Sequence, residues 1–238
     1  MKSLLARTLR KLFRKRNLGR WRLPFEYSVH VLAGEREPEL KHLSQICPGS
    51  GVAVDVGANL GYYTFKMAKR FKHVYSFEPN PNASFPIRTS GFHNVTLIDL
   101  ALSDTHGSAE LKIPVIGKVV LAGWASLIPG NCPGADHHLV RQVELATLDE
   151  FELADVALIK IDVEGHELEV LRGARQTISA SRPILIVEIK NDQVAQVSNL
   201  LVSYGYVRVP LQLIAGVAGS AENHIFRHQS PFEAACAG

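Results

Sequence analysis

The stretch VAVDVGANLGYYT (residues 52–64) constrains the fold of this chain more than any other segment. An apolar, β-branched run leads directly into Gly57, Asn59 and Gly61 and then into a helix-like segment. Runs of this composition form buried strands, and a tight strand-to-helix turn needs residues that accept unusual backbone angles. The stretch therefore predicts a strand–turn–helix unit of an α/β fold, with a nucleotide-like ligand held at the turn.

Strand-like and helix-like segments alternate downstream of this unit, which predicts an open, mostly parallel sheet with helices on both faces. The predicted strands are 52–56, 73–78, 94–102, 156–162, 182–189, 206–210 and 223–228. Residues 105–146 break the alternation, because two strand-like runs flank a loop rich in glycine and proline. We expect a single domain over residues 31–238, with an inserted β-hairpin region at 105–146 that shapes a substrate pocket.

The first residues of the chain differ from the rest in charge. Residues 1–22 carry nine Lys or Arg and no acidic residue, whereas the other 216 residues carry 17 basic and 23 acidic side chains. We assign residues 1–30 to a basic amphipathic N-terminal segment, in which residues 1–22 either contact a membrane peripherally or form a solvated helix. No apolar run is long enough to span a bilayer. Three widely spaced cysteines favour the cytoplasm. If the N-terminal segment contacts a membrane, the protein would lie peripherally at the inner membrane surface.

The glycine loop departs from two known phosphate-binding patterns. No lysine follows Gly61, as a phosphate-gripping loop requires, and Asn59 stands where a dinucleotide fingerprint has its second glycine. Glu78 ends the second predicted strand, where an acidic residue accepts hydrogen bonds from ribose hydroxyls. An adenosine ligand without phosphates and with an amino-acid tail fits both features, and S-adenosylmethionine is such a molecule.

A second group of polar residues follows two later strands. Asp162, Glu164 and Glu188 end these strands, and His166 begins the next helix, so we expect all four to face one crevice. If the reaction is methyl transfer to a hydroxyl, as the family resemblance given below implies, it needs a base that takes the hydroxyl proton. Our hypothesis is that His166 or Glu164 is this base and that Asp162 orients the acceptor or the cofactor's amino group. The carboxylates are also compatible with a divalent metal, which the sequence leaves open; Glu167 is predicted to be a solvated helix residue.

The order of several segments resembles the FkbM-type S-adenosylmethionine-dependent methyltransferases. The matching segments are VDVGANLGYYT (54–64), FEPNP (77–81), NVTLIDLALSD (94–104), WASL (124–127), TLDEF (147–151), IKIDVEGHELEVLRGA (159–174) and RPILIVEI (182–189). The resemblance implies a class I methyltransferase fold and methylation of hydroxyl groups on sugars, polyketides or glycolipids. In length and layout the chain is similar to bacterial nodulation-factor fucose 2-O-methyltransferases.

The resemblance also implies roles for individual residues around S-adenosylmethionine. Glu78 would bind the ribose, and Ser103 and Asp104 would contact the adenine. The methionine end would be held by Asp55, Gly57, Asn59 and Gly61. The implied acceptor is a sugar-containing small molecule or a glycolipid. Three alternatives stay open: a nucleic-acid methyltransferase, disfavoured by the acidic body, a nicotinamide-dependent oxidoreductase, and a module that binds the cofactor without catalysis.

Overall fold

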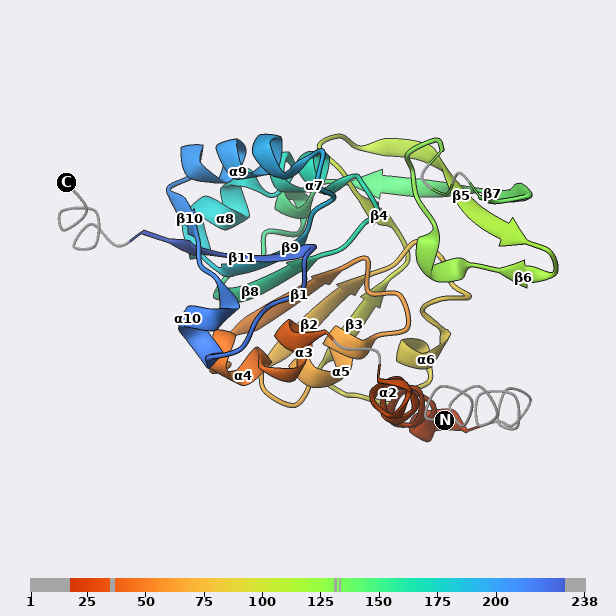
Figure 1. The fold of residues 1–238 in the computed structure, drawn as a ribbon, viewed down its shortest axis with the longest axis horizontal. Helices are drawn as coiled ribbons and strands as arrows, with labels where there is room; N and C mark the ends of the chain where they lie inside the picture. Colours follow the sequence, from red (N-terminus) through yellow and green to blue (C-terminus); the bar gives the residue numbers. More distant parts are fainter. Residues whose placement is uncertain (1–17, 35–36, 131, 133, 230–238) are drawn as a thin grey trace.

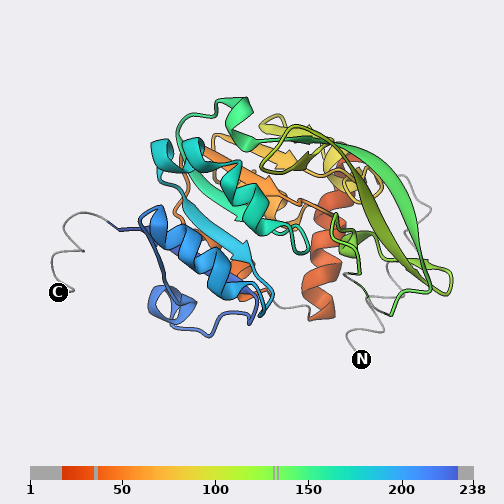
Figure 2. The same cartoon turned by 90° about the horizontal axis from the view of Figure 1, so that it is seen from above.

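The computed structural model describes residues 18–34, 37–130, 132 and 134–229, and within them a seven-stranded sheet forms the centre of the molecule (Figures 1 and 2). Its strands are β1 Val52–Val56, β2 His73–Phe77, β3 Val95–Ile98, β8 Val156–Ile161, β9 Ile184–Glu188, β10 Tyr206–Arg208 and β11 Asn223–His228. Their order is β10-β11-β9-β8-β1-β2-β3, and β11 is antiparallel to both of its neighbours while the other pairs are parallel. The predicted open, mostly parallel sheet is confirmed.

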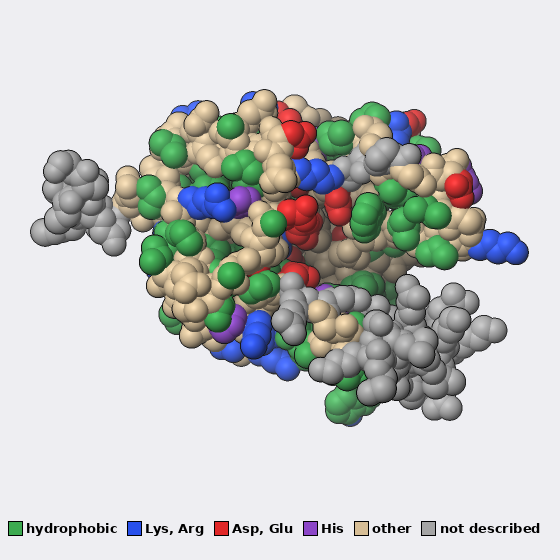
Figure 3. All heavy atoms as spheres, viewed as in Figure 1, with side chains coloured by type: hydrophobic (Ala, Val, Ile, Leu, Met, Phe, Trp, Pro, Cys, Tyr) green, Lys and Arg blue, Asp and Glu red, His purple; other side chains and the backbone are tan. Residues whose placement is uncertain are grey.

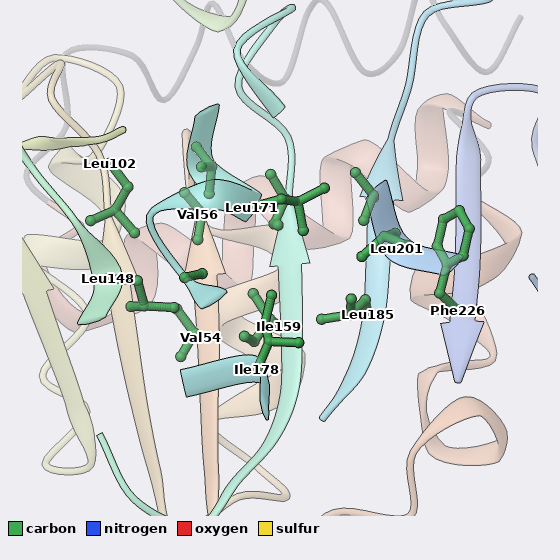
Figure 4. Packing of buried hydrophobic residues seen from close by; sticks show 14 of the residues in the cluster. Val54, Val56, Leu102, Leu148, Ile159, Leu171, Ile178, Leu185, Leu201 and Phe226 are labelled. Carbon is green, nitrogen blue, oxygen red and sulfur yellow. The ribbon is translucent and has the colours of Figure 1, made fainter. Parts of the chain in front are cut away.

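Helices cover both faces of this sheet (Figure 1). One face carries α7 Glu167–Arg172, α8 Arg175–Ser181 and α9 Val194–Ser203; the other carries α3 Pro38–Lys41, α4 Leu43–Ile46, α5 Tyr62–Met67 and α10 Leu211–Ala215. Alternate residues of each strand supply the two cores, since successive side chains point to opposite faces. Val54 and Val56 pack with Leu171 and Ile178 on the first face, as Figure 4 shows, and Ala53 packs with Met67 on the second.

The segment before the first strand is part of this packing. Helix α2 (Arg22–Ala33) follows the short helix η1 (Gly19–Trp21) and packs against α5, and its residues Leu23 and Val29 are buried. Residues that the sequence analysis assigns to the N-terminal segment thus belong to the folded body. Residues 1–17 lie outside the described residues. Among the described helices, none combines the length and apolarity that crossing a membrane requires.

The third predicted strand is wrong in its extent. Residues 94–102 form two strands in different sheets: β3 ends at Ile98, and Ala101–Leu102 form β4, which pairs with β7. Asp99 lies at the break, where it accepts hydrogen bonds from Arg88 of α6 (Phe85–Arg88). An apolar run without glycine or proline hides this transfer between sheets, because each half is itself a good strand.

The inserted region forms a second sheet of β4, β5 (Gly107–Ile116), β6 (Val119–Val120) and β7 (His137–Ala146). Strands β5 and β7 are antiparallel over their length, so the predicted hairpin is present. The loop between β6 and β7 includes the short helix η2 (Ala122–Trp124), and η3 (Leu148–Phe151) leads back to β8. The hairpin projects from one end of the domain, beyond the edge of the main sheet (Figures 1 and 2).

Candidate active site

A cavity of about 250 Å³ lies at the carboxyl ends of β1, β2, β8 and β9. Residues of all four strand ends line it, and Ala122, Gly123 and Ala125 of the inserted region close it from the other side. A smaller cavity of about 80 Å³ adjoins it and shares Glu37, Gly57, Asn59 and Asp162 with the first. The carboxyl ends of parallel strands are where open α/β sheets bind ligands, so this is the candidate site.

The glycine loop forms one end of the cavity and packs tightly on strand β8. Gly57 has a φ of +77°, and a Cβ built on it would lie 1.8 Å from the carbonyl oxygen of Asp162. Asn59 also has a positive φ of +47°, and its backbone amide donates to Glu78 Oε2 at 2.8 Å. The amide of Asn80 donates to Glu78 Oε1 at 2.8 Å, so the backbone fixes the Glu78 carboxylate at the cavity wall.

Four of the predicted cofactor residues do not line the main cavity, and of these Asp55 and Gly61 line the smaller one. Asp55 is buried, accepts a hydrogen bond from Thr64 Oγ1 at 2.6 Å and lines only the smaller cavity. Ser103 is also buried, and neither it nor Asp104 is among the residues that line the two cavities. At this end of the site the main cavity is lined instead by Ala101 and Leu102, the residues of β4.

The turn after β8 holds Glu164 and His166 at the cavity wall. Glu164 and Gly165 have φ of +55° and +106°, a conformation that needs support when the residue is not glycine. Glu167 gives this support: its Oε1 accepts the backbone amide of Gly165 at 2.9 Å and that of Val163 at 3.3 Å. The prediction that Glu167 is solvated is therefore wrong, because its side chain is buried and turned back into the loop.

His166 lines the cavity, and its ring is hydrogen-bonded through Nε2 while Nδ1 is buried without a hydrogen-bond partner. Nε2 lies 2.9 Å from Ser103 Oγ, and Nδ1 lies 3.6 Å from a carboxylate oxygen of Glu169. Burial lowers the pKa of His166 from its ordinary value, against the opposing effect of the Glu169 carboxylate. The imidazole is therefore neutral at neutral pH and has the capacity to accept a proton.

Beneath the cavity, Lys160 is fully buried and connects the ends of β8 and β9. Its Nζ donates to Asn223 Oδ1 at 2.8 Å and lies 3.5 Å from Asp162 and 3.8 Å from Glu188. Burial alone would lower the pKa of Lys160, but these carboxylates raise it, so the lysine stays charged. A lysine inside the buried strand VALIKI is in itself a sequence signal of a buried ion pair.

Glu37 is a cavity residue that the sequence analysis missed. It follows α2 and precedes Pro38, and it lines both cavities. Burial raises the pKa of its carboxyl, and the charge of Lys160 acts in the opposite direction. No local pattern marks Glu37 as functional, because only the folded chain brings this segment over the crevice.

The carboxyls of the site make the stability of the ligand-free protein depend on pH. Burial raises the pKa of Glu78 to about 7, and burial with the neighbouring Asp162 raises that of Glu188 to about 8. Between pH 6.5 and 8 the folded state keeps protons that the unfolded state has lost, so stability falls as pH rises. Each carboxyl contributes a slope of at most about 1.4 kcal/mol per pH unit.

We therefore expect the Tm of the ligand-free protein to fall by a few degrees from pH 6.5 to pH 8, measured by thermal denaturation. His224, whose pKa burial lowers to about 4, has the opposite slope, but that contribution is complete above its unfolded value near pH 6.5. The substitution Glu188→Gln should flatten the profile. A Tm that rises over this interval would contradict the assignment of these protonation states.

Among the described residues, no group of three or more His, Cys, Asp or Glu side chains has an arrangement that could hold a metal ion. The nearest approach to such a group is the set of carboxylates at the ends of β8 and β9. These carboxylates already face Lys160 and, at 3.3 Å from Glu164, Lys190. The site is built around lysine–carboxylate pairs.

Comparison with known proteins identifies relatives of the chain. At 25% identity over 68% of this chain, it is similar to the hexuronic acid methyltransferase AglP of Haloferax volcanii. At 27% identity over 53% of this chain, it is similar to Methyltransferase 1 of Beauveria bassiana. The chain spans 65% and 59% of the lengths of these two proteins.

The fold also matches a solved structure, that of methyltransferase FkbM from Methylobacillus flagellatus KT. The TM-score is 0.54 at 15% identity, over 95% of this chain and 59% of the other. The strand order and the antiparallel β11 are those of a class I methyltransferase fold, as the resemblance implied. The methyltransferase FkbM domain model matches residues 55–208, from the glycine loop through β10. The chain therefore belongs to the FkbM methyltransferase family.

Proposed function

We propose that the protein transfers a methyl group from S-adenosylmethionine to a hydroxyl of a sugar or glycolipid. The observation that carries this proposal is one continuous cavity with two different ends. The glycine loop and Glu78 form one end, and the carboxylates of β8 and β9 form the other, beneath the inserted region. A donor at the first end and an acceptor at the second would meet over the end of β8, and holding them together is itself a large part of catalysis.

The residues present fit this cofactor. Gly57 leaves no room for a side chain, so a ligand is able to approach its backbone, and Glu78 presents a fixed carboxylate at the end of β2 where ribose hydroxyls donate. Asp162, at the junction of both cavities, would accept the ammonium group of the methionine end. The apolar Ala101 and Leu102 would contact the adenine in place of Ser103 and Asp104. When bound, the cofactor supplies an electrophilic methyl group on a sulfonium.

Two residues are candidates for the base that takes the acceptor's proton. Neutral His166 is hydrogen-bonded to Ser103 and faces Glu169, an arrangement that fixes the ring and would stabilise its protonated form. Glu164 lines the same wall and is held 3.3 Å from Lys190. We expect His166→Ala or Glu164→Gln to lower kcat by roughly 100-fold with the dissociation constant of the cofactor changed little. Calorimetric titration and steady-state kinetics measure the two quantities, and full activity in both variants would remove the assignment.

A panel of glycosides and lipid-linked oligosaccharides tests the identity of the acceptor. The specific candidate is the 2-hydroxyl of fucose in a nodulation factor, so the panel includes a fucoside. The expected result is one added methyl group on a sugar, detected by mass spectrometry. Trp124 on η2 is half-exposed beside the cavity-lining Gly123 and would stack on a sugar ring. Methylation of nucleic acid instead would support the alternative, which the acidic cavity disfavours; cofactor binding with no turnover would indicate a binding module.

The contact of residues 1–22 with a membrane stays a prediction, as does the location at the inner membrane surface. The nine basic side chains of this segment would be drawn to anionic lipids. A glycolipid acceptor would be presented at the same surface, which is why we keep the two proposals together.

A further inference from the structure

The charge of the main cavity is unusually one-sided. Five carboxyl side chains line it: Glu37, Glu78, Asp162, Glu164 and Glu188. No Lys or Arg is among its described lining residues. The lysines that approach these carboxylates, Lys160 and Lys190, lie behind them, and Lys160 is buried in the floor. In the space-filling view, acidic side chains gather in the hollow at the middle of the face (Figure 3).

Protein groups leave this negative charge only partly compensated. Burial raises the pKa of Glu37, of Glu78 to about 7 and of Glu188 to about 8, and for Glu188 the neighbouring Asp162 adds to the effect. Glu78 already accepts two backbone amides and Glu188 faces Lys160, so it is burial that makes their ionisation unfavourable. A cation or a hydrogen-bond donor of a ligand in the cavity would favour the ionised forms.

The cofactor would supply part of the positive charge and of the hydrogen-bond donors that these carboxyls accept. Its sulfonium and ammonium charges exceed its single carboxylate by one, and its ribose hydroxyls would be taken up by Glu78. Glu188 and Glu164, at the ends of β9 and β8 beneath the inserted region, remain for the acceptor. Sugar hydroxyls donate hydrogen bonds to carboxylates, and an ammonium group pairs with them, whereas a carboxylate on the acceptor would be repelled.

We propose that this site selects its acceptor by charge: it takes an uncharged or ammonium-bearing sugar and rejects a sugar that carries a carboxylate. This inference rests on the proposed function and separates this chain from its relative in Haloferax volcanii, which is a hexuronic acid methyltransferase by name. At 25% identity the two proteins need not share an acceptor. The cavity's carboxylates are the residues that would make the difference.

The test compares three matched acceptors: a methyl hexoside, the corresponding 2-amino-2-deoxyhexoside and the corresponding methyl hexuronide, in gluco, galacto and manno configurations. We expect kcat/KM for the hexuronide to be roughly 30-fold below that of the hexoside. Repulsion between two unit negative charges about 6 Å apart would lower kcat/KM by on the order of 100-fold, and the positive charges of Lys160 and Lys190 offset part of this repulsion. The amino sugar should equal or exceed the hexoside.

Substitutions test whether the carboxyls of the cavity cause the preference for the hexoside over the hexuronide. Measured at pH 9, where Glu188 is ionised, Glu188→Gln and Glu37→Gln should each lower the hexoside-to-hexuronide ratio by roughly threefold, a ratio in which losses common to both acceptors cancel. Glu110→Gln, on an exposed part of β5 outside the cavity lining, is the matched control and should leave the ratio unchanged.

Binding separates this inference from the proposed function. Dissociation constants of the three acceptors are measured by calorimetry on the protein loaded with S-adenosylhomocysteine, so that charge preference is read without turnover. A hexuronide that is used or bound as well as the hexoside, or failure of all three to bind, overturns the inference. Acceptors that bind with the expected order but receive no methyl group would contradict the proposed sugar methylation while leaving the charge selection supported.

Discussion

Replacing Gly57 by alanine is expected to abolish cofactor binding and to lower the free energy of unfolding by about 3 kcal/mol. Two costs combine. The φ of +77° is unfavourable for alanine, and its Cβ would lie 1.8 Å from the carbonyl oxygen of Asp162, which is backbone and unable to rotate away. The loop and the end of β8 must therefore separate, and with them the two ends of the site. Urea denaturation and calorimetric titration with S-adenosylmethionine measure the two effects.

Gly117→Ala is the matched control for this experiment. Gly117 also has a positive φ, +58°, but a Cβ there would meet nothing within 4 Å. The substitution Gly117→Ala should lower the free energy of unfolding only by the cost of the left-handed backbone conformation, about 1 kcal/mol, and leave cofactor affinity intact. If Gly57→Ala binds the cofactor as tightly as Gly117→Ala does, the close packing of the glycine loop on β8 is not what forms the site.

Replacing Lys160 by methionine is expected to destabilise the protein by about 3 kcal/mol at pH 8 and to weaken cofactor binding strongly at neutral pH. Methionine keeps most of the volume but removes the charge that faces Asp162 and Glu188. Without this charge, which lowers the pKa of Glu188, the Glu188 carboxyl would keep its proton to a higher pH. The affinity for the cationic cofactor should consequently recover as pH rises, which a purely structural defect would not produce.

Lys190→Met serves as its control, because Lys190 lies 3.3 Å from Glu164 and its side chain is 39% exposed, whereas Lys160 is buried. Exposed pairs contribute about 0.5 kcal/mol, so little stability should be lost. Titrations of both variants between pH 6 and 9 decide the matter. Equal stability and equal pH profiles in the two lysine variants would show that Lys160 has no special role beneath the cavity.

Local sequence patterns predict the structure best where a pattern is compatible with only one kind of secondary structure. The sequence predicts strands 52–56 and 223–228 with their observed bounds. It also predicts that the glycine loop and Glu78 serve one site, and in the structure the Asn59 amide donates to Glu78. The antiparallel hairpin at 105–146 was likewise recognisable from two strand-like runs around one loop. In these cases short-range chemistry decides the structure.

Local patterns fail where a side chain's role depends on what lies across the fold. Glu167 has the sequence of an exposed helix residue, yet its carboxylate turns back to hold the Gly165 amide. No local pattern indicates that Ser103 is hydrogen-bonded to His166, 63 residues along the chain. Glu37 belongs to the site only because α2 packs on α5. Such contacts leave no periodic signal in the sequence, since each joins segments that are independent along the chain.

The inserted hairpin has a consequence for the choice of acceptor. Its contacts with the rest of the site run through a few small residues: Gly123 lies against Asn59, and the Ser126 hydroxyl donates to the carbonyl of Glu164 at 2.7 Å. Most of β5, β6 and β7 makes no part of the cofactor end of the cavity. We therefore expect substitutions in the hairpin to change the choice of acceptor while leaving the affinity for the cofactor unchanged.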